Sequence, residues 1–178
     1  GDGMVMLPEI LKGALDGVWT KKNLERKRVI YLTPQGPVLT QEKAQRLARD
    51  FDQIVLICGR YGGVDERFIE KHVDEELSVG DYILSGGELA AMTVIDSVSR
   101  FLPGVLGNSA SPLEETFKDN LLEEALYTRP REFEGEKVPE VLTSGNHQKV
   151  ADWRKKNRIV RTLQKRPDLL SKSSVSKD

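Results

Sequence analysis

Glycine-containing loops are the part of the sequence best suited to holding a ligand. Each follows a short apolar run: TPQG at residues 33–36, GRYGG at 59–63, and the pair SVG at 78–80 and SGG at 85–87. Glycine carries no Cβ, so another backbone or a flat ligand can approach it closely. Where such loops meet, the pocket is walled mainly by backbone. This wall suits an adenine ring, because N–H and C=O groups read the edge of the base.

Motifs of several other chemistries do not occur. The sequence has neither a Walker A motif nor a G-x-G-x-x-G after a strand, which argues against a phosphate-cradling loop and a Rossmann site. It has neither G-x-S-x-G nor H-E-x-x-H. The one cysteine, Cys58, and the two histidines, His72 and His147, are spaced too far apart for a zinc site. Carboxylates and arginines near the glycine loops remain as candidates for chemistry.

The apolar runs before these loops predict buried strands. Residues 29–32 (VIYL) are β-branched and aromatic, and 54–58 (IVLIC) are almost continuously apolar. Continuous apolarity indicates a strand covered on both faces, as in a parallel sheet. Residues 77–79 and 82–84 predict further strand, interrupted at Gly80.

Helices are predicted between the strands. Pro8 starts a helix that Gly17 ends, Thr40 caps a helix that runs to about Asp50, and Asp65 caps a helix over 66–72. A longer helix is predicted over 88–102, and a basic helix over 148–164. The apolar stripe of the helix over 88–102 is expected at Ala91, Ile95, Val98 and Leu102.

Alternation of strands and helices favours an α/β layer fold with a mainly parallel sheet. In such sheets ligands bind outside the carboxyl ends of the strands, where the glycine loops fall. The 178 residues are 38% hydrophobic and 31% charged, as in a soluble globular protein. A single cysteine fits a reducing compartment, and no apolar run is long enough to cross a bilayer. We therefore expect a cytoplasmic protein without membrane contact.

Charge is distributed unevenly although the net charge is only −1. Residues 149–166 and 21–28 are rich in lysine and arginine, whereas 65–81 and 114–140 lean acidic. This asymmetry is typical of a surface that faces a polyanion. Two solvated helix faces would give the same pattern, and the charges alone do not separate the two interpretations.

The glycine loops and their surroundings resemble the bacterial tRNA (guanine-N1)-methyltransferase family. The matching stretches are GDGMVM, VIYLTPQG, ICGRYGGVDERF, DEELSVGDYILSGGELAAMTVIDSVSRFLPGVLG, YTRPREFEG and VPEVLTSGNH. They follow one another in the family's order along nearly the whole chain. The resemblance implies methylation of the guanosine just 3′ of the anticodon of tRNA, with S-adenosylmethionine as the methyl donor.

The resemblance also implies architecture. We expect a SPOUT-type α/β domain over 1–106, with helices on both faces of the sheet and a trefoil knot at its C-terminal end. The family's N-terminal strand is not in this sequence, so the sheet would be one strand short. An interdomain linker over 107–119 and a partial helical, tRNA-contacting domain over 120–178 would follow. The family works as a homodimer whose active site uses both subunits, and its activity is linked to magnesium.

Site residues follow from the same match. Backbone groups of Val79, Tyr82 and Leu84 would read the adenine. The cofactor pocket as a whole would use Tyr31, Leu32, Thr33, Pro34, Gly59, Arg60, Tyr61, Ser78, Val79, Gly80, Tyr82, Leu84, Gly86, Gly87 and Ala90. No metal ligands are implied. Trp153 is interpreted as a core residue of the C-terminal domain, with RNA contact as the alternative.

Two catalytic residues are implied. Arg100 matches the family's catalytic arginine, whose guanidinium would stabilise the negative charge that develops on O6 when guanine loses its N1 proton. The residues alone also allow a plain i,i+4 pair with Asp96. Glu115 aligns with the aspartate that serves as general base, and Glu114 is a neighbouring alternative.

The sequence departs from the family pattern at Glu115, where the family has aspartate, and at Gly62, where the family has glutamate in GRYEG. These departures leave two alternatives open beside the methyltransferase. One is a homologue that binds RNA without turnover, and the other is a SPOUT methyltransferase that acts on ribosomal RNA.

Overall fold

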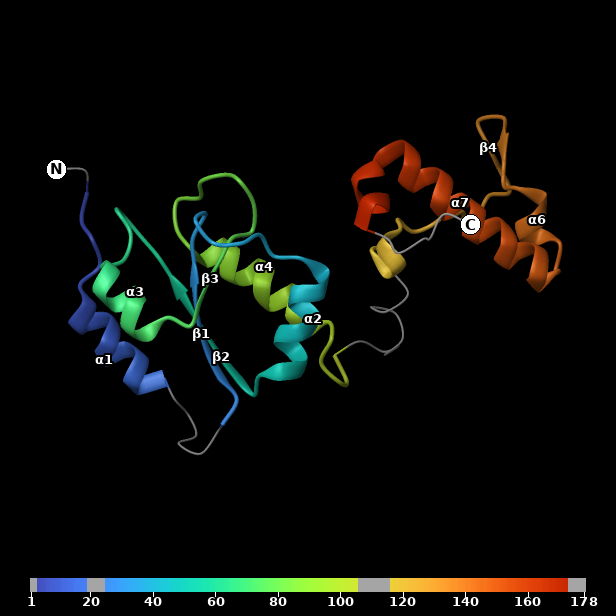
Figure 1. Ribbon diagram of the computed structural model, residues 1–178. Helices are drawn as coiled ribbons and strands as arrows, with labels where there is room; N and C mark the ends of the chain where they lie inside the picture. The colour runs from blue at the N-terminus through green and yellow to red at the C-terminus, as the bar shows by residue number, and fades with distance from the viewer. Residues whose placement is uncertain (1–2, 19–24, 106–115, 173–178) are drawn as a thin grey trace. The chain divides into compact units, whose positions relative to one another are not determined.

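The structure is a computed structural model that describes residues 3–18, 25–105 and 116–172 (Figure 1). It divides into two compact units, residues 1–109 and 110–178. Residues 107–115 of the predicted linker lie outside the described residues, and the roles predicted for the two parts of the chain stay predictions.

A parallel sheet forms the centre of the first unit. Strands β1 (Lys27–Leu32), β2 (Gln53–Cys58) and β3 (Glu75–Leu77) lie in the order β2-β1-β3. The register pairs Leu32 with Cys58 on one side and with Leu77 on the other. All three strands run in the same direction, so the predicted parallel sheet is confirmed. Their carboxyl ends therefore meet at one edge, the edge from which the glycine loops leave.

Helices cover both faces of this sheet (Figure 1). Helices α2 (Gln41–Asp50) and α4 (Glu88–Ser99) pack on Ile30 and Leu32 of β1. Helices α1 (Pro8–Val18) and α3 (Glu66–His72) pack on the opposite face, against Val29 and Tyr31. Successive side chains of a strand point to opposite faces, which is why the run VIYL supplies both cores.

Both predicted N-caps of the first unit are confirmed. The Thr40 hydroxyl accepts a hydrogen bond from the backbone N–H of Lys43 at 3.2 Å, at the start of α2. The Asp65 carboxylate accepts one from the N–H of Arg67 at 3.0 Å, at the start of α3. Arg67 hydrogen bonds hold the pKa of Asp65 below its usual value, so this cap stays ionised at neutral pH.

The chain after β3 differs from the prediction. Residues 82–84 form an irregular loop and not a strand, because the chain reverses at Gly80 (φ 152°) and leaves the sheet after Leu77. Helix α4 ends at Ser99, three residues early. Its buried residues are Ala90, Ala91 and Val94, whereas two of the residues predicted for the stripe, Ile95 and Leu102, are 58% and 42% exposed.

The second unit is organised around α7 (His147–Lys165), which confirms the predicted basic helix. A short hairpin of β4 (Glu132–Phe133) and β5 (Glu136–Lys137) precedes α6 (Glu140–Thr143). Short 3-10 helices η1 (Lys118–Asn120) and η2 (Pro167–Lys172) flank these elements. None of the helices in the described ranges is long and apolar enough to cross a membrane.

Side chains of α7 hold the extended segment 121–125. The buried Thr162 hydroxyl accepts from the N–H of Leu122 at 2.9 Å, and Asn157 accepts from the N–H of Ala125 at 2.8 Å. From the same helix, Arg158 and Arg161 donate to main-chain carbonyls of this segment. These four bonds thus pair main-chain groups of the segment without a strand partner.

Gly13, in the interior of α1, offers a test of helix propensity. A Cβ at this position would meet nothing within 4 Å. We expect Gly13→Ala to stabilise the protein by about 0.5–1 kcal/mol, because alanine loses less backbone entropy on folding. Thermal unfolding measures the effect. Gly104→Ala is the matched control: its surroundings are equally open, but its φ of 80° disfavours a Cβ, so it should destabilise.

Candidate ligand pocket

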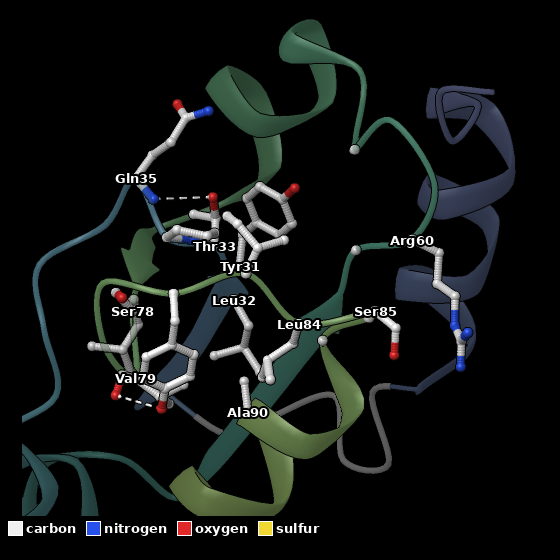
Figure 2. A pocket seen from close by; sticks show the side chains of 18 of the residues that line it. Tyr31, Leu32, Thr33, Gln35, Arg60, Ser78, Val79, Leu84, Ser85 and Ala90 are labelled. Carbon is white, nitrogen blue, oxygen red and sulfur yellow. Dashed lines mark hydrogen bonds between the residues drawn. The ribbon is translucent and has the colours of Figure 1, made fainter. Parts of the chain in front are cut away.

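A cavity of about 370 Å³ lies at the carboxyl ends of the strands (Figure 2). The loops after β1, β2 and β3 and the first turn of α4 form its walls. Every residue predicted for the cofactor pocket lines it: Tyr31, Leu32, Thr33, Pro34, Gly59, Arg60, Tyr61, Ser78, Val79, Gly80, Tyr82, Leu84, Gly86, Gly87 and Ala90. The structure therefore brings these residues together around one cavity.

Six further lining residues were missed by the sequence reasoning. They are Gln35, Gly62, Gly63, Leu77, Ile83 and Ser85. Five of them lie in the same loops as predicted residues, so extending each predicted site over its whole loop would have included them, whereas Leu77 is the last residue of β3. Gly62, one of the two departures from the family pattern, is thus part of the wall.

Main-chain hydrogen bonds join the loop after β1 to the segment after β3. Thr33 donates its N–H to the Leu77 carbonyl at 3.0 Å, and Ser78 donates its N–H to the Pro37 carbonyl at 2.9 Å. Gly36 lies so close that a Cβ there would be 2.5 Å from the backbone of Glu76 and Leu77. Backbone atoms cannot swing aside, so this contact requires glycine.

A second backbone contact joins the loop after β2 to the start of α4. Gly87 donates its N–H to the Gly59 carbonyl at 3.0 Å. A Cβ on Gly87 would lie 2.6 Å from the Cα of Cys58 and 3.0 Å from the N of Gly59. The close backbone approach expected of the glycine pair is therefore confirmed at Gly87. At Gly86 the nearest atom is instead the flexible carboxylate end of Glu88.

Apolar side chains gather on one side of the pocket. Figure 2 shows Leu32, Val79, Leu84 and Ala90 close together there, with Arg60 and Ser85 on another side. Leu32 and Ala90 are only 5% and 7% exposed, because they also belong to the core beneath the pocket. The core therefore holds this surface in place. The arrangement can take a flat apolar ring.

The backbone N–H and C=O groups beside this surface differ in whether they are already bonded within the chain. The N–H of Tyr82 is donated to the Gly80 carbonyl at 2.9 Å, and the Tyr82 hydroxyl donates to the Val79 carbonyl at 3.1 Å. The N–H and C=O of Leu84 bond to no other residue in the described part of the chain. Of the three residues expected to read adenine, Leu84 thus offers both a donor and an acceptor.

Arg60 and Tyr31 line the pocket, and the titratable residues Glu88 and Cys58 are sequence neighbours of lining residues. Arg60 Nε donates to Glu88 Oε1 at 2.8 Å, with both side chains about half exposed. The pKa of Glu88 is lowered by its own backbone N–H and by Arg60. Burial raises the pKa of Tyr31 and of Cys58, so both keep their protons at neutral pH.

The two predicted catalytic residues are not brought to the pocket within the described chain. Arg100 is the C-cap of α4, whereas the pocket lies at the N-terminus of that helix. At 1.5 Å rise per residue, Arg100 lies about 15 Å along the helix axis from Ala90. Glu115 and its alternative Glu114 lie outside the described residues.

The fold and the pocket define an α/β protein with a backbone-walled cavity at the carboxyl ends of parallel strands. The family described as tRNA (Guanine-1)-methyltransferase TrmD matches residues 1–172. The chain belongs to this family, which confirms the resemblance read from its glycine loops.

Curated relatives support the assignment over the whole chain. A protein of Pelotomaculum thermopropionicum is 49% identical over 178 residues, covering 100% of this chain and 70% of the relative. A protein of Clostridioides difficile strain 630 is 51% identical over 174 residues, covering 98% and 75%. A protein of Syntrophotalea carbinolica is 50% identical over 176 residues, covering 99% and 70%. Each is named tRNA (guanine-N(1)-)-methyltransferase.

Proposed function

We propose that this chain is an S-adenosylmethionine-dependent tRNA methyltransferase that methylates N1 of guanosine 37. The observation that carries the proposal is the backbone-walled pocket, in which the N–H and C=O of Leu84 have no partner among the described residues and lie beside an apolar surface. Relatives about 50% identical bear the name of this activity.

The pocket fits the methyl donor by the chemistry of its walls. The adenine ring would lie against Leu32, Val79 and Ala90, and its edge would bond with the backbone of Leu84. Bound there, S-adenosylmethionine supplies an electrophilic methyl group on its sulfonium. The glycine loops would let the donor lie close to the main chain, because their glycines carry no Cβ.

The remaining chemistry is the removal of a proton and the stabilisation of charge. Glu115 accepts the N1 proton of guanine, and Arg100 stabilises the negative charge that then builds on O6. Both groups must reach the target base beside the pocket. Orientation of the base against the methyl group supplies much of the rate enhancement.

A homodimer would reconcile the position of Arg100 with this chemistry. Arg100 lies at the far end of α4 from the pocket of its own chain, so we propose that it serves the pocket of a partner protomer. The outer face of α4 supports this arrangement: Leu89, Met92 and Ile95 are 58%, 65% and 58% exposed. A second copy that covered this face would bury apolar surface.

The proposed function also carries expectations for the knot, the second unit and the place of action. The paired loops after β1 and β3, together with Gly87 packed on Gly59, support a SPOUT-type trefoil knot. The second unit would contact tRNA, and the protein would act in the cytoplasm, where its substrate is found.

Within the described residues no group of three or more His, Cys, Asp and Glu side chains could hold a metal ion. Assay with and without EDTA tests the expected magnesium dependence.

Methyl transfer to an unmodified tRNA transcript tests the proposed function. We expect one methyl group per transcript that has guanosine at position 37, and none when that guanosine is replaced by adenosine. Transfer only to fragments of ribosomal RNA would contradict the proposed substrate. Binding of the transcript and the donor without turnover would contradict the proposed activity.

Glu115→Gln tests the general base. Glutamine keeps the size of the side chain but cannot take a proton, so we expect the single-turnover rate to fall by about 10²- to 10⁴-fold. The affinity for the methyl donor should stay unchanged. Glu114→Gln is the matched control and should keep the wild-type rate. An unchanged rate in Glu115→Gln, with loss in Glu114→Gln, would move the role to the neighbouring residue.

A further inference from the structure

A second cavity, of about 400 Å³, lies wholly within the second unit. The methyl-transfer chemistry does not use it. We name it the aromatic pocket, because Tyr127 and Trp153 line it together with three arginines, Arg129, Arg131 and Arg154.

The rings of the aromatic pocket are partly open to solvent. The centroids of Tyr127 and Trp153 are 6.3 Å apart with a tilt of 59°, and Tyr127 is 49% exposed. Leu126 beside them is 74% exposed, and Val138, Leu142 and Val150 also line the pocket. Exposed aromatic faces beside an apolar wall suit a flat ring with polar edges, because stacking needs no fixed pattern of hydrogen bonds.

The charges around the aromatic pocket favour an anionic ligand. Arg131 Nη2 donates to the Thr143 hydroxyl at 3.0 Å, which fixes the guanidinium at the wall. Arg129 forms no ion pair within the described ranges. Glu124 is the one carboxylate among the described residues of the lining, and its Oε1 already lies 3.3 Å from Arg154 Nε. The pocket is therefore positive.

We propose that the aromatic pocket binds one unpaired nucleotide of the RNA substrate. The base stacks on the half-exposed ring of Tyr127 and contacts the tilted ring of Trp153, and the phosphate contacts Arg129 and Arg131. An unpaired nucleotide is required because a base within a helix has both faces covered by its neighbours. The proposal rests on the proposed function only in taking tRNA as the substrate.

The rest of the second unit agrees with an RNA ligand. Lysines and arginines outnumber carboxylates over 116–172. Lys149 and Lys156, two turns apart on α7, are exposed and form no ion pair among the residues that the structure describes. Both are available to contact phosphates that neighbour the bound nucleotide.

Binding of the full chain to an unmodified tRNA transcript, measured over a range of salt concentrations, tests the proposal. Tyr127→Leu keeps an apolar contact with Trp153 but removes a stacking face, and should weaken binding by about 5- to 100-fold. Arg129→Gln removes one contact with a phosphate. It should therefore reduce the slope of the logarithm of the binding constant against the logarithm of the salt concentration by about 0.7. Lys137→Gln is the matched control: it removes an exposed cation of the same unit outside the pocket, and should leave affinity near that of the wild type.

Trp153 provides a direct readout. The chain has two tryptophans, so Trp19→Phe leaves Trp153 as the only one. We expect its fluorescence to be quenched by the transcript, with the same midpoint as binding, because a base stacks beside it. Affinity for S-adenosylmethionine should not change in any of these variants.

Two results would overturn the proposal. One is unchanged RNA affinity in both Tyr127→Leu and Arg129→Gln, with no quenching of Trp153. The other is a changed oligomeric mass of Tyr127→Leu or Arg129→Gln without loss of RNA affinity. That result would mean that the aromatic pocket contacts protein and not RNA. The proposed function is judged separately by methyl transfer in the wild type, which can succeed with this pocket unused.

Discussion

Arg100→Ala is expected to lower the single-turnover rate of methyl transfer by about 10²- to 10³-fold while the affinity for S-adenosylmethionine stays unchanged. The guanidinium acts on charge that appears only as the N1 proton leaves, so its loss affects the transition state and not the bound donor. Rapid-quench kinetics with saturating donor and transcript measure the rate, and calorimetry measures donor affinity.

Arg46→Ala is the matched control for Arg100→Ala. Arg46 is an exposed arginine on α2 that does not line the pocket, so its removal should leave the rate unchanged. Arg100→Lys should recover part of the rate, because lysine keeps the charge but not the planar fork. If Arg100→Ala lowered the free energy of unfolding by as much as it raised the activation free energy, Arg100 would instead have a structural role.

Mixing variants tests whether Arg100 acts across a dimer. Arg100→Ala is combined with Ala90→Leu, a variant in which the larger side chain fills the pocket. If each site joins Arg100 of one protomer to the pocket of its partner, every mixed dimer has one intact site. A random mixture should then recover about a quarter of wild-type activity. No recovery would place both groups in the same protomer.

Gly87→Ala is expected to destabilise the protein by about 3 kcal/mol and to weaken donor binding. Its Cβ would lie 2.6 Å from the Cα of Cys58, and main chain on both sides must shift to relieve the overlap. That shift moves the loop that carries Gly59 and Arg60 in the pocket wall. Denaturant unfolding measures the stability, and calorimetry measures the donor affinity.

Gly86→Ala gives the matched comparison for Gly87→Ala. It is the neighbouring glycine of the same loop, but a Cβ there would meet the end of the Glu88 side chain, which can turn away. We expect a loss of stability below about 1 kcal/mol. Equal losses in the two variants would show that the contact with Cys58 does not decide the stability.

Local signals in the sequence predicted most of the first unit. Thr40 and Asp65 carry side-chain oxygens that accept from the first helical N–H groups, a short-range effect that sequence alone specifies. The run IVLIC identified a strand covered on both faces. Because the carboxyl ends of parallel strands meet at one edge, the glycine loops after them had to gather into one pocket.

Features that depend on distant contacts were less predictable. Residues 82–84 have the composition of a strand, but the reversal at Gly80 leads the chain away from the sheet before they can pair. The apolar stripe of α4 was predicted partly at the wrong residues. The helix packs on the sheet through the small residues Ala90 and Ala91, and leaves the larger Ile95 exposed. The distance of Arg100 from the pocket follows from the direction of α4, which no local pattern specifies.

The two backbone contacts that close the pocket also bear on how the protein folds. One joins Thr33 to Leu77 and the other joins Gly59 to Gly87, so both link residues far apart along the chain. Such contacts form late, after the loops between them have lost their entropy. We therefore expect the methyl donor to bind only a chain that has almost completed folding. Saturating donor should slow unfolding and leave the refolding rate nearly unchanged.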